Sequence, residues 1–259
     1  MQLRGVFTAL VTPFAQGAID RENFNALCQR QLDAGVAGLV PCGTTGETPT
    51  LTEDEWADLV STTVRISNGK VPVIAGCGSN STARTVATIT RARNLGADAA
   101  LVVFPYYNKP NPAGLRAHVE ACCRSGLPIV LYHVPGRTGQ RIELEQLAEL
   151  CAIDGVVALK EATGDLTLGQ RLLNHTPRAI LSGDDFTFAA LMAMGGAGTI
   201  SVLSNLAPQM TVAWARAAET GDVETLRRLR ARLLPVVQYL FSDTNPAPVK
   251  AALASMGLC

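Results

Sequence analysis

Lys160 lies at the end of an apolar segment, Val156-Val157-Ala158-Leu159-Lys160. Lysine supplies only four of the 22 basic residues, so arginine provides most of the positive charge. Burial disfavours an ammonium ion and lowers its pKa from the ordinary value of about 10.4. A neutral amine is the nucleophile that a Schiff-base enzyme requires. The alternative is a lysine at a strand end with a buried stem and a solvated head, and Lys160 alone leaves both interpretations open.

Other polar residues that could assist such an amine also follow apolar segments. Gly43-Thr44-Thr45-Gly46 is either a tight turn, in which glycines supply positive φ, or a cradle of N–H groups and hydroxyls for a carboxylate. Tyr132 is either a core tyrosine or a phenol that transfers protons beside the amine. Arg137 either caps a loop or binds a carboxylate through its guanidinium. We expect Thr44, Tyr132 and Arg137 to face one pocket.

Three further polar residues near these segments are interpreted as structural. Strand alternation directs His133 away from Tyr132. Asp184 and Asp185 are expected to cap the following helix, because no other carboxylates converge with them to bind a metal. The remaining set is an amine, phenols, hydroxyls and an arginine, with neither a metal nor a phosphate site. That chemistry suits enamine formation from a small 2-oxo acid.

The elements that must position these residues are eight short apolar segments, alternating with helical periodicity. The segments are near-continuously apolar, which indicates parallel strands buried on both faces. Eight such strands, without a G-x-G-x-x-G turn after the first, favour a closed (β/α)8 TIM barrel over an open doubly wound sheet. They are 6–11, 38–41, 71–75, 99–104, 128–133, 156–160, 179–182 and 199–202.

Three further helical patterns follow the eighth segment, over about 208–220, 222–241 and 246–256. We therefore expect a barrel over residues 1–207 and a helical C-terminal extension over 208–259, packed on the barrel as one structural unit. In such a barrel, the C-terminal ends of the strands and their following loops converge on one face. The polar residues described above all lie at those ends.

Composition excludes several classes of protein. The 259 residues are 47% hydrophobic and 17% charged with zero net charge, which gives no sign of nucleic-acid or membrane binding. The seven cysteines form no C-x-x-C pair, which favours a reducing compartment and offers no metal-ligand spacing. The N-terminus lacks a signal-peptide pattern, and no apolar run reaches membrane-span length. The sequence predicts a cytoplasmic protein without a cofactor.

Motifs spread along nearly the whole chain resemble the dihydrodipicolinate synthase family, which belongs to the pyruvate-dependent class I aldolase superfamily. The matching stretches are Gly43-Thr44-Thr45-Gly46-Glu47, Pro105-Tyr106-Tyr107-Asn108-Lys109-Pro110, Tyr132-His133-Val134-Pro135-Gly136-Arg137-Thr138-Gly139, Lys160-Glu161-Ala162-Thr163-Gly164-Asp165, Ser182-Gly183-Asp184-Asp185 and Gly195-Gly196-Ala197-Gly198-Thr199-Ile200-Ser201. The resemblance implies condensation of pyruvate with aspartate semialdehyde to give 4-hydroxy-tetrahydrodipicolinate, in lysine and diaminopimelate biosynthesis.

The resemblance also implies roles for individual residues. Lys160 would form an imine with pyruvate, and protons would be relayed by Thr44, Tyr132 and Tyr107, the last reaching in from a neighbouring subunit. The pyruvate carboxylate would be held by Thr45 and its backbone amide. The remaining implied contacts are Arg137 with the semialdehyde carboxylate and the backbones of Gly183 and Ile200 with the pocket. A tyrosine donated across an interface implies a homodimer or homotetramer.

The chain departs from the family pattern in three places. His133 stands where relatives usually have asparagine, which bears on the choice of the second substrate. At the lysine effector site, Glu53, Trp56 and Arg84 replace two histidines and a glutamate, although Asn80 and Tyr106 remain, so we expect weak or absent lysine inhibition. The sequence stops at Cys259, where relatives continue, and this bears on stability and tetramer geometry more than on chemistry.

Three other functions are compatible with parts of this pattern. A different pyruvate-dependent aldolase, acting on a 2-keto-3-deoxy sugar acid or 4-hydroxy-2-oxoglutarate, would share the imine chemistry. A non-catalytic metabolite-binding paralogue would have no need of the nucleophile. A pyridoxal phosphate barrel would need a phosphate site, and none is evident around the last two strands. The context of Arg137 favours the synthase.

Overall fold

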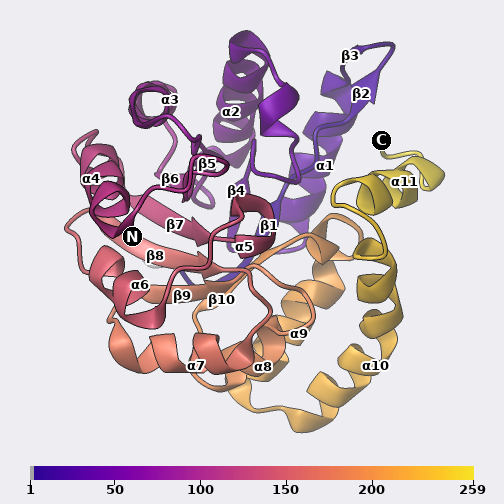
Figure 1. The fold of residues 1–259 in the computed structure, drawn as a ribbon. Coiled ribbons are helices and arrows are strands. Elements are labelled where there is room, and N and C mark those ends of the chain that lie inside the picture. The colour runs from indigo at the N-terminus through magenta and orange to yellow at the C-terminus, as the bar shows by residue number, and fades with distance from the viewer. Residues whose placement is uncertain (1–2) are drawn as a thin grey trace.

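A computed structural model describes residues 3–259 and shows eight parallel strands arranged as a barrel (Figure 1). The strand order is β4-β1-β10-β9-β8-β7-β6-β5, and a bridge between Leu39 and Val73 joins the two ends. The expected (β/α)8 barrel is therefore confirmed, and each predicted strand overlaps an observed one. The strands are β1 Gly5–Ala9, β4 Gly38–Val40, β5 Ile74–Gly76, β6 Ala99–Val103, β7 Ile129–His133, β8 Val156–Glu161, β9 Ala179–Ser182 and β10 Gly198–Ser201.

Helices alternate with the strands and surround the barrel (Figure 1). A capping box begins α2: Thr52 accepts a hydrogen bond from the Glu55 N–H, and the Glu55 carboxylate accepts one from the Thr52 N–H. The helices between strands are α1 Arg21–Asp33, α2 Glu53–Ser67, α3 Thr82–Asn94, α4 Pro112–Cys123, α6 Leu144–Cys151, α7 Leu166–His175 and α8 Phe188–Ala193.

Three helices follow β10, as predicted: α9 Pro208–Thr220, α10 Val223–Leu240 and α11 Ala247–Ser255. The last of them lies near α1 and the segment around Phe14 (Figure 1). Five short elements were not expected from periodicity, because each is shorter than a detectable repeat. They are a hairpin of β2 Phe14–Ala15 and β3 Ala18–Ile19, the one-turn helix α5 Pro135–Thr138, and the 3₁₀ turns η1 Thr48–Thr50 and η2 Leu203–Asn205.

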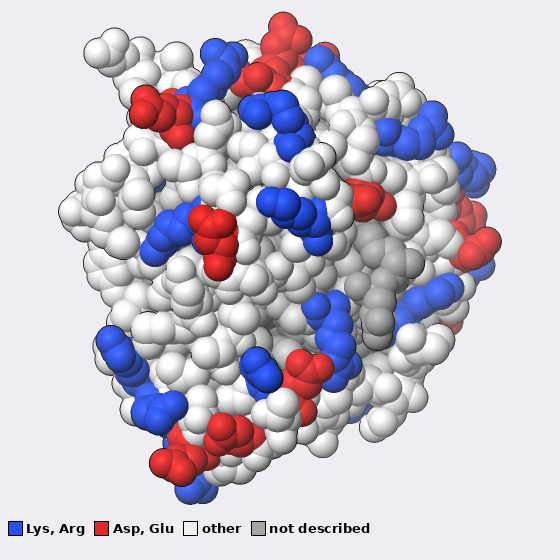
Figure 2. Space-filling model, turned by 180° about the vertical axis from the view of Figure 1, so that it is seen from behind, with Lys and Arg blue, Asp and Glu red and all other residues white. Residues whose placement is uncertain are grey.

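The core has two layers because successive strand side chains point to opposite faces. One apolar cluster fills the barrel and includes Phe7, Val130, Leu181 and Ile200. The other lies between the strands and the helices around them. Within residues 3–259, no helix is long and apolar enough to cross a membrane. Basic and acidic side chains are interspersed over the face shown in Figure 2.

The expectation that Asp184 and Asp185 cap the next helix is wrong. Asp184 Oδ1 accepts hydrogen bonds from the N–H groups of Phe186 and Thr187, which shapes the turn before α8 without capping that helix. Asp185 Oδ2 instead accepts from the N–H groups of Val202 and Leu203, at 2.9 and 2.8 Å. The buried carboxylate thus satisfies backbone donors at the end of β10.

Candidate active site

Lys160 and Tyr132 are adjacent at the C-terminal ends of two neighbouring strands. The register of β7 and β8 pairs Tyr132 with Lys160, and both side chains are only 6% exposed. Lys160 Nζ lies 4.1 Å from the centroid of the Tyr132 ring. The prediction that these two side chains meet inside a barrel is confirmed. A buried amine against an aromatic face is the environment expected of an imine-forming lysine.

Gly183 leaves room for the stem of Lys160. A Cβ atom at position 183 would lie 2.6 Å from Lys160 Cε and 2.6 Å from the Cβ of Ala162. The Gly183 N–H donates to the Glu161 carbonyl at 2.6 Å, which holds the end of β9 against the end of β8. Ile200 is buried in the same barrel-filling cluster as Tyr132. The structure therefore places Gly183 against the stem of Lys160, and Ile200 in the interior of the barrel.

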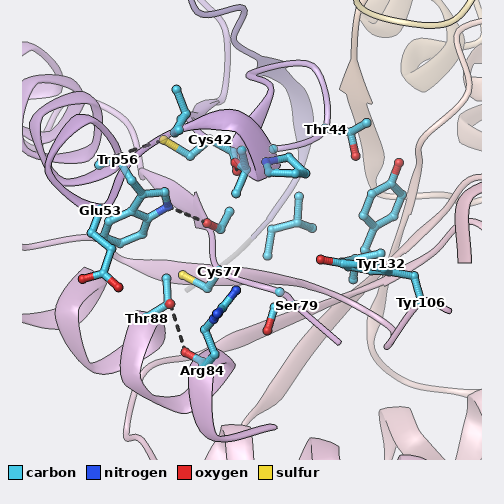
Figure 3. Close-up of a pocket in the computed structure, with 18 of the residues that line it drawn as sticks. Cys42, Thr44, Glu53, Trp56, Cys77, Ser79, Arg84, Thr88, Tyr106 and Tyr132 are labelled. Carbon is cyan, nitrogen blue, oxygen red and sulfur yellow. Dashed lines mark hydrogen bonds between the residues drawn. The ribbon is translucent and has the colours of Figure 1, made fainter. Parts of the chain in front are cut away.

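The loop after β4 carries Thr44 and Thr45. Figure 3 shows the hydroxyls of Thr44 and Tyr132 pointing toward one another. Thr45 is buried, and its Oγ1 accepts a hydrogen bond from Asn245 Nδ2 at 3.0 Å. The loop is closed by hydrogen bonds from the Gly46 N–H to the Gly43 carbonyl and from the Glu47 N–H to the Thr44 carbonyl, both 3.1 Å.

One interpretation of this loop was a tight turn whose glycines have positive φ. That expectation is wrong, because neither Gly43 nor Gly46 has a positive φ. The left-handed residues are Cys42 (φ 55°) and Glu47 (φ 58°), which flank the loop. Gly46 serves close packing instead, since a Cβ there would lie 3.1 Å from the Cys42 nitrogen and the Leu10 carbonyl oxygen. Because non-glycine residues seldom adopt this conformation, the loop is held in a strained shape by its surroundings.

Arg137 lies on α5, at the rim of the same face. Its guanidinium is exposed and donates to the Asn245 carbonyl at 2.8 Å. Asn245, between α10 and α11, thus contacts both Thr45 and Arg137. Sequence reasoning missed Asn245. The only local signal is the turn-like Asp243-Thr244-Asn245-Pro246, and nothing in it indicates a contact 200 residues away.

A cavity of about 640 Å³ opens at this face (Figure 3). At one end it is lined by Thr44, Tyr132 and Arg137. The other end extends between α2 and α3, where Glu53, Trp56 and Arg84 line it. Tyr106 also borders the cavity, whereas Asn80 contributes a carbonyl that accepts from Asn108 Nδ2. Residues that match the effector site therefore share one cavity with Thr44 and Tyr132, whereas Lys160 lies behind Tyr132 and is not among the residues that line it.

Tyr107 is not brought into this cavity by its own chain. Its side chain is 89% exposed, and its backbone has a φ of 70°, in the left-handed region. Burial of a tyrosine ring is favourable, so a fully exposed ring at a strained position is unusual for an isolated subunit.

His133 lies on the outer side of β7, as alternation predicted. It is fully buried, and its Nε2 accepts from the Ile142 N–H at 3.2 Å. Its Nδ1 lies 3.7 Å from Glu161 Oε1, the next residue after Lys160. The departure from the family pattern at His133 therefore lies behind the strand and not in the cavity.

Burial raises the pKa of the Asp184 carboxyl, and the Glu161 carboxylate raises it further.

The whole of this sequence from residue 2 to 259 matches the model of the dihydrodipicolinate synthetase family. Proteins named 4-hydroxy-tetrahydrodipicolinate synthase are similar to it. The protein from Nitratidesulfovibrio vulgaris strain DP4 is 46% identical over 261 residues, which covers 99% of this chain and 89% of the relative. The protein from Hyphomonas neptunium is 46% identical over 260 residues, with 98% and 89% covered.

Solved structures of such proteins have the same fold. A dihydrodipicolinate synthase from Thermotoga maritima superposes with a TM-score of 0.96 at 43% identity, covering all of this chain and 90% of the other. A chloride-inhibited dihydrodipicolinate synthase from Acinetobacter baumannii, complexed with pyruvate, gives a TM-score of 0.96 at 38% identity, with 99% and 90% covered. The likeness extends over the full barrel and its C-terminal helices.

Proposed function

This chain belongs to the dihydrodipicolinate synthetase family, and we propose that it is a class I lyase that condenses pyruvate with L-aspartate 4-semialdehyde to give 4-hydroxy-tetrahydrodipicolinate. The observation that carries the proposal is Lys160, buried with its amine against the ring of Tyr132 at the C-terminal face of the barrel. Relatives that are 44–46% identical over nearly the whole chain are named 4-hydroxy-tetrahydrodipicolinate synthase.

The reaction begins at the amine of Lys160. Its Nζ attacks C2 of pyruvate, and loss of one water gives an imine. Loss of a proton from C3 converts the imine into an enamine, whose C3 attacks the aldehyde carbon of the semialdehyde. The aldehyde oxygen takes up a proton and remains as the 4-hydroxyl. The amine of the semialdehyde then attacks C2, which closes the ring and releases Lys160 as a free amine.

Thr44 and Tyr132 are assigned the proton transfers of this sequence. Their hydroxyls point toward one another (Figure 3), and the amine of Lys160 lies against the Tyr132 ring, which supports a proton relay through these two residues. Thr45 and its backbone amide hold the pyruvate carboxylate, and Arg137 holds the carboxylate of the semialdehyde. The backbones of Gly183 and Ile200 line the pocket around the imine. No step in this scheme needs a cofactor.

A second copy of the chain completes the relay in this proposal. Tyr107 would enter the partner's cavity, which explains its exposure in the single chain. We therefore propose a homodimer as the smallest active unit, either alone or within a homotetramer. We place the enzyme in the cytoplasm, because all of its cysteines are free thiols and free thiols are typical of a reducing compartment.

We propose that the barrel (1–207) and the C-terminal extension (208–259) work as one functional unit. Asn245 contacts Thr45 and Arg137, so the extension contributes to the site. Neither part is proposed to carry a separate activity.

The acceptor distinguishes this function from that of other pyruvate-dependent aldolases. The purified protein is incubated with pyruvate and one aldehyde at a time: aspartate semialdehyde, glyoxylate or glyceraldehyde. We expect rapid pyruvate consumption only with aspartate semialdehyde, and the product is identified by its mass. Consumption with glyoxylate or glyceraldehyde but not with aspartate semialdehyde would assign the chain to another aldolase.

A further inference from the structure

The C-terminal helix α11 contacts the Thr44–Thr45 loop through an ion pair. Lys250 Nζ lies 2.5 Å from Glu47 Oε1, and 4.6 Å from the centroid of the Phe14 ring in β2. The two charged side chains are 23% and 28% exposed. Lysine is rare in this chain, and Lys250 is partly buried between an anion and an aromatic face. This is a more defined environment than that of a solvated surface lysine.

Glu47 is fixed to the loop that it follows. It has a φ of 58°, and its N–H donates to the Thr44 carbonyl at 3.1 Å. Its own carbonyl accepts from both the N–H and the hydroxyl of Thr50, each at 2.9 Å. A displacement of the Glu47 backbone therefore displaces Thr44 as well.

We propose that Lys250 is a positioning residue, which acts through Glu47 to hold the loop at residues 43–47 in the shape that binds the pyruvate carboxylate. The inference rests on the proposed function, since it assigns pyruvate to this loop. Asn245 gives the C-terminal segment a second attachment, to Thr45. Two contacts from one segment constrain both the middle and the end of the loop, and Lys250 supplies the charged one.

The expected defect is in pyruvate binding. Contacts to a carboxylate are made in the ground state and the transition state alike, so their loss raises KM and leaves kcat nearly unchanged. Lys250→Met keeps the length of the side chain but removes its charge, and Glu47→Gln does the same for its partner. We expect each to raise the half-saturating pyruvate concentration about fivefold, the effect of losing one partly buried ion pair.

The double variant tests whether Lys250 and Glu47 act through their mutual interaction or independently of one another. If Lys250 acts through Glu47, then Lys250→Met combined with Glu47→Gln is no worse than either single variant, because the interaction is already lost. Independent roles would give a product of the two effects, about 25-fold. Lys70→Met is the matched control, because Lys70 is exposed on the loop after α2.

The experiment titrates pyruvate against the fraction of protein trapped by borohydride, measured as intact mass, with a thermal unfolding scan of each variant. A fivefold shift in the two single variants and the double, but not in Lys70→Met, supports the proposal. An unchanged half-saturation in the folded Lys250→Met or Glu47→Gln variant overturns it and reduces the pair to a contact that docks α11. If the folded wild type gives no adduct, the proposed function itself fails.

Discussion

Around Lys160, reactivity and packing depend on the same few contacts. The amine lies against the Tyr132 ring, and its stem passes the bare backbone of Gly183. An imine can form only if the amine reaches pyruvate at the correct distance and angle, and small displacements of reacting groups are costly. The environment of Lys160 is thus defined by an aromatic ring on one side and by the absence of a side chain on the other.

Gly183→Ala tests the space around the nucleophile. The added methyl would lie 2.6 Å from Lys160 Cε, too close for the stem to remain in place. We expect the rate of imine formation to fall about 100-fold, the cost of misplacing a reacting group by about 1 Å. Rapid-quench trapping with borohydride measures that rate. Gly136→Ala is the control, since a Cβ at position 136 meets no atom within 4 Å. Equal rates in both variants would contradict the packing role of Gly183.

The sequence predicts some of these residues and not others, for a physical reason. Lys160 and Tyr132 are detectable because a polar residue at the end of an apolar strand is costly unless it is used. Asn245 and Lys250 are not detectable, because their partners Thr45 and Glu47 are about 200 residues away in the chain. Local patterns carry no information about such pairs.

At the scale of elements, parallel strands convert sequence order into spatial order. Residues that end neighbouring strands meet at one face, so the eight apolar segments were sufficient to predict both the barrel and the site face. The one-turn helix α5, which carries Arg137, has too few residues to show a period. The position of Arg137 at the rim was therefore predicted from the barrel and not from its own element.

The buried carboxyl group of Asp185, which follows β9 and accepts hydrogen bonds at the end of β10, predicts that the stability of the protein depends on pH. Burial raises the pKa of Asp185 from 3.8 to about 6, although the N–H groups of Leu203 and Val202 oppose the shift. Because the folded pKa is raised, the contribution of Asp185 is greatest below about pH 4 and is lost as the pH rises through about 6. The wild type should lose about 3 kcal/mol relative to Asp185→Asn between those limits.

Urea unfolding of both proteins at a series of pH values measures this difference. Asp185→Asn keeps an oxygen that can accept from the N–H groups of Val202 and Leu203, but it cannot titrate. A difference in unfolding free energy that does not change with pH would show that Asp185 titrates normally.

The cavity end between α2 and α3 predicts insensitivity to lysine. Its lining includes Arg84 and Arg91, which would repel the ammonium groups of free lysine. The carboxylate of Glu53 lies 3.7 Å from Arg91 and is therefore already neutralised in part. We expect the initial rate to be unchanged by L-lysine at physiological concentrations. Strong inhibition under these conditions would mean that the ligand binds elsewhere or that this end of the cavity rearranges.

At the scale of the whole molecule, the proposed mechanism requires that two copies of the chain associate. Tyr107 is 89% exposed here, and the proposed mechanism places it in the cavity of a partner. One structural relative is described as a monomeric dihydrodipicolinate synthase variant, with a TM-score of 0.96 and 43% identity, so the fold itself does not require assembly. The need for a partner has to be tested through activity.

Mixing two inactive variants tests whether Tyr107 acts across an interface. Lys160→Ala lacks the nucleophile, and Tyr107→Phe lacks the donated hydroxyl. In a mixed dimer, the Tyr107→Phe chain has an intact Lys160 and receives Tyr107 from its Lys160→Ala partner. We expect the mixture to regain activity that neither variant has alone, in the same synthase assay. A mixture that stays inactive, although mixed dimers are present by mass spectrometry, would place Tyr107 outside the relay.

The imine at Lys160 is the central claim, and it can be measured directly. Wild type and Lys160→Ala are treated with borohydride, with and without pyruvate, and their intact masses are compared. We predict a pyruvate-dependent adduct on the wild type and none on folded Lys160→Ala. A folded wild type without an adduct, or an equal adduct on Lys160→Ala, would contradict the account.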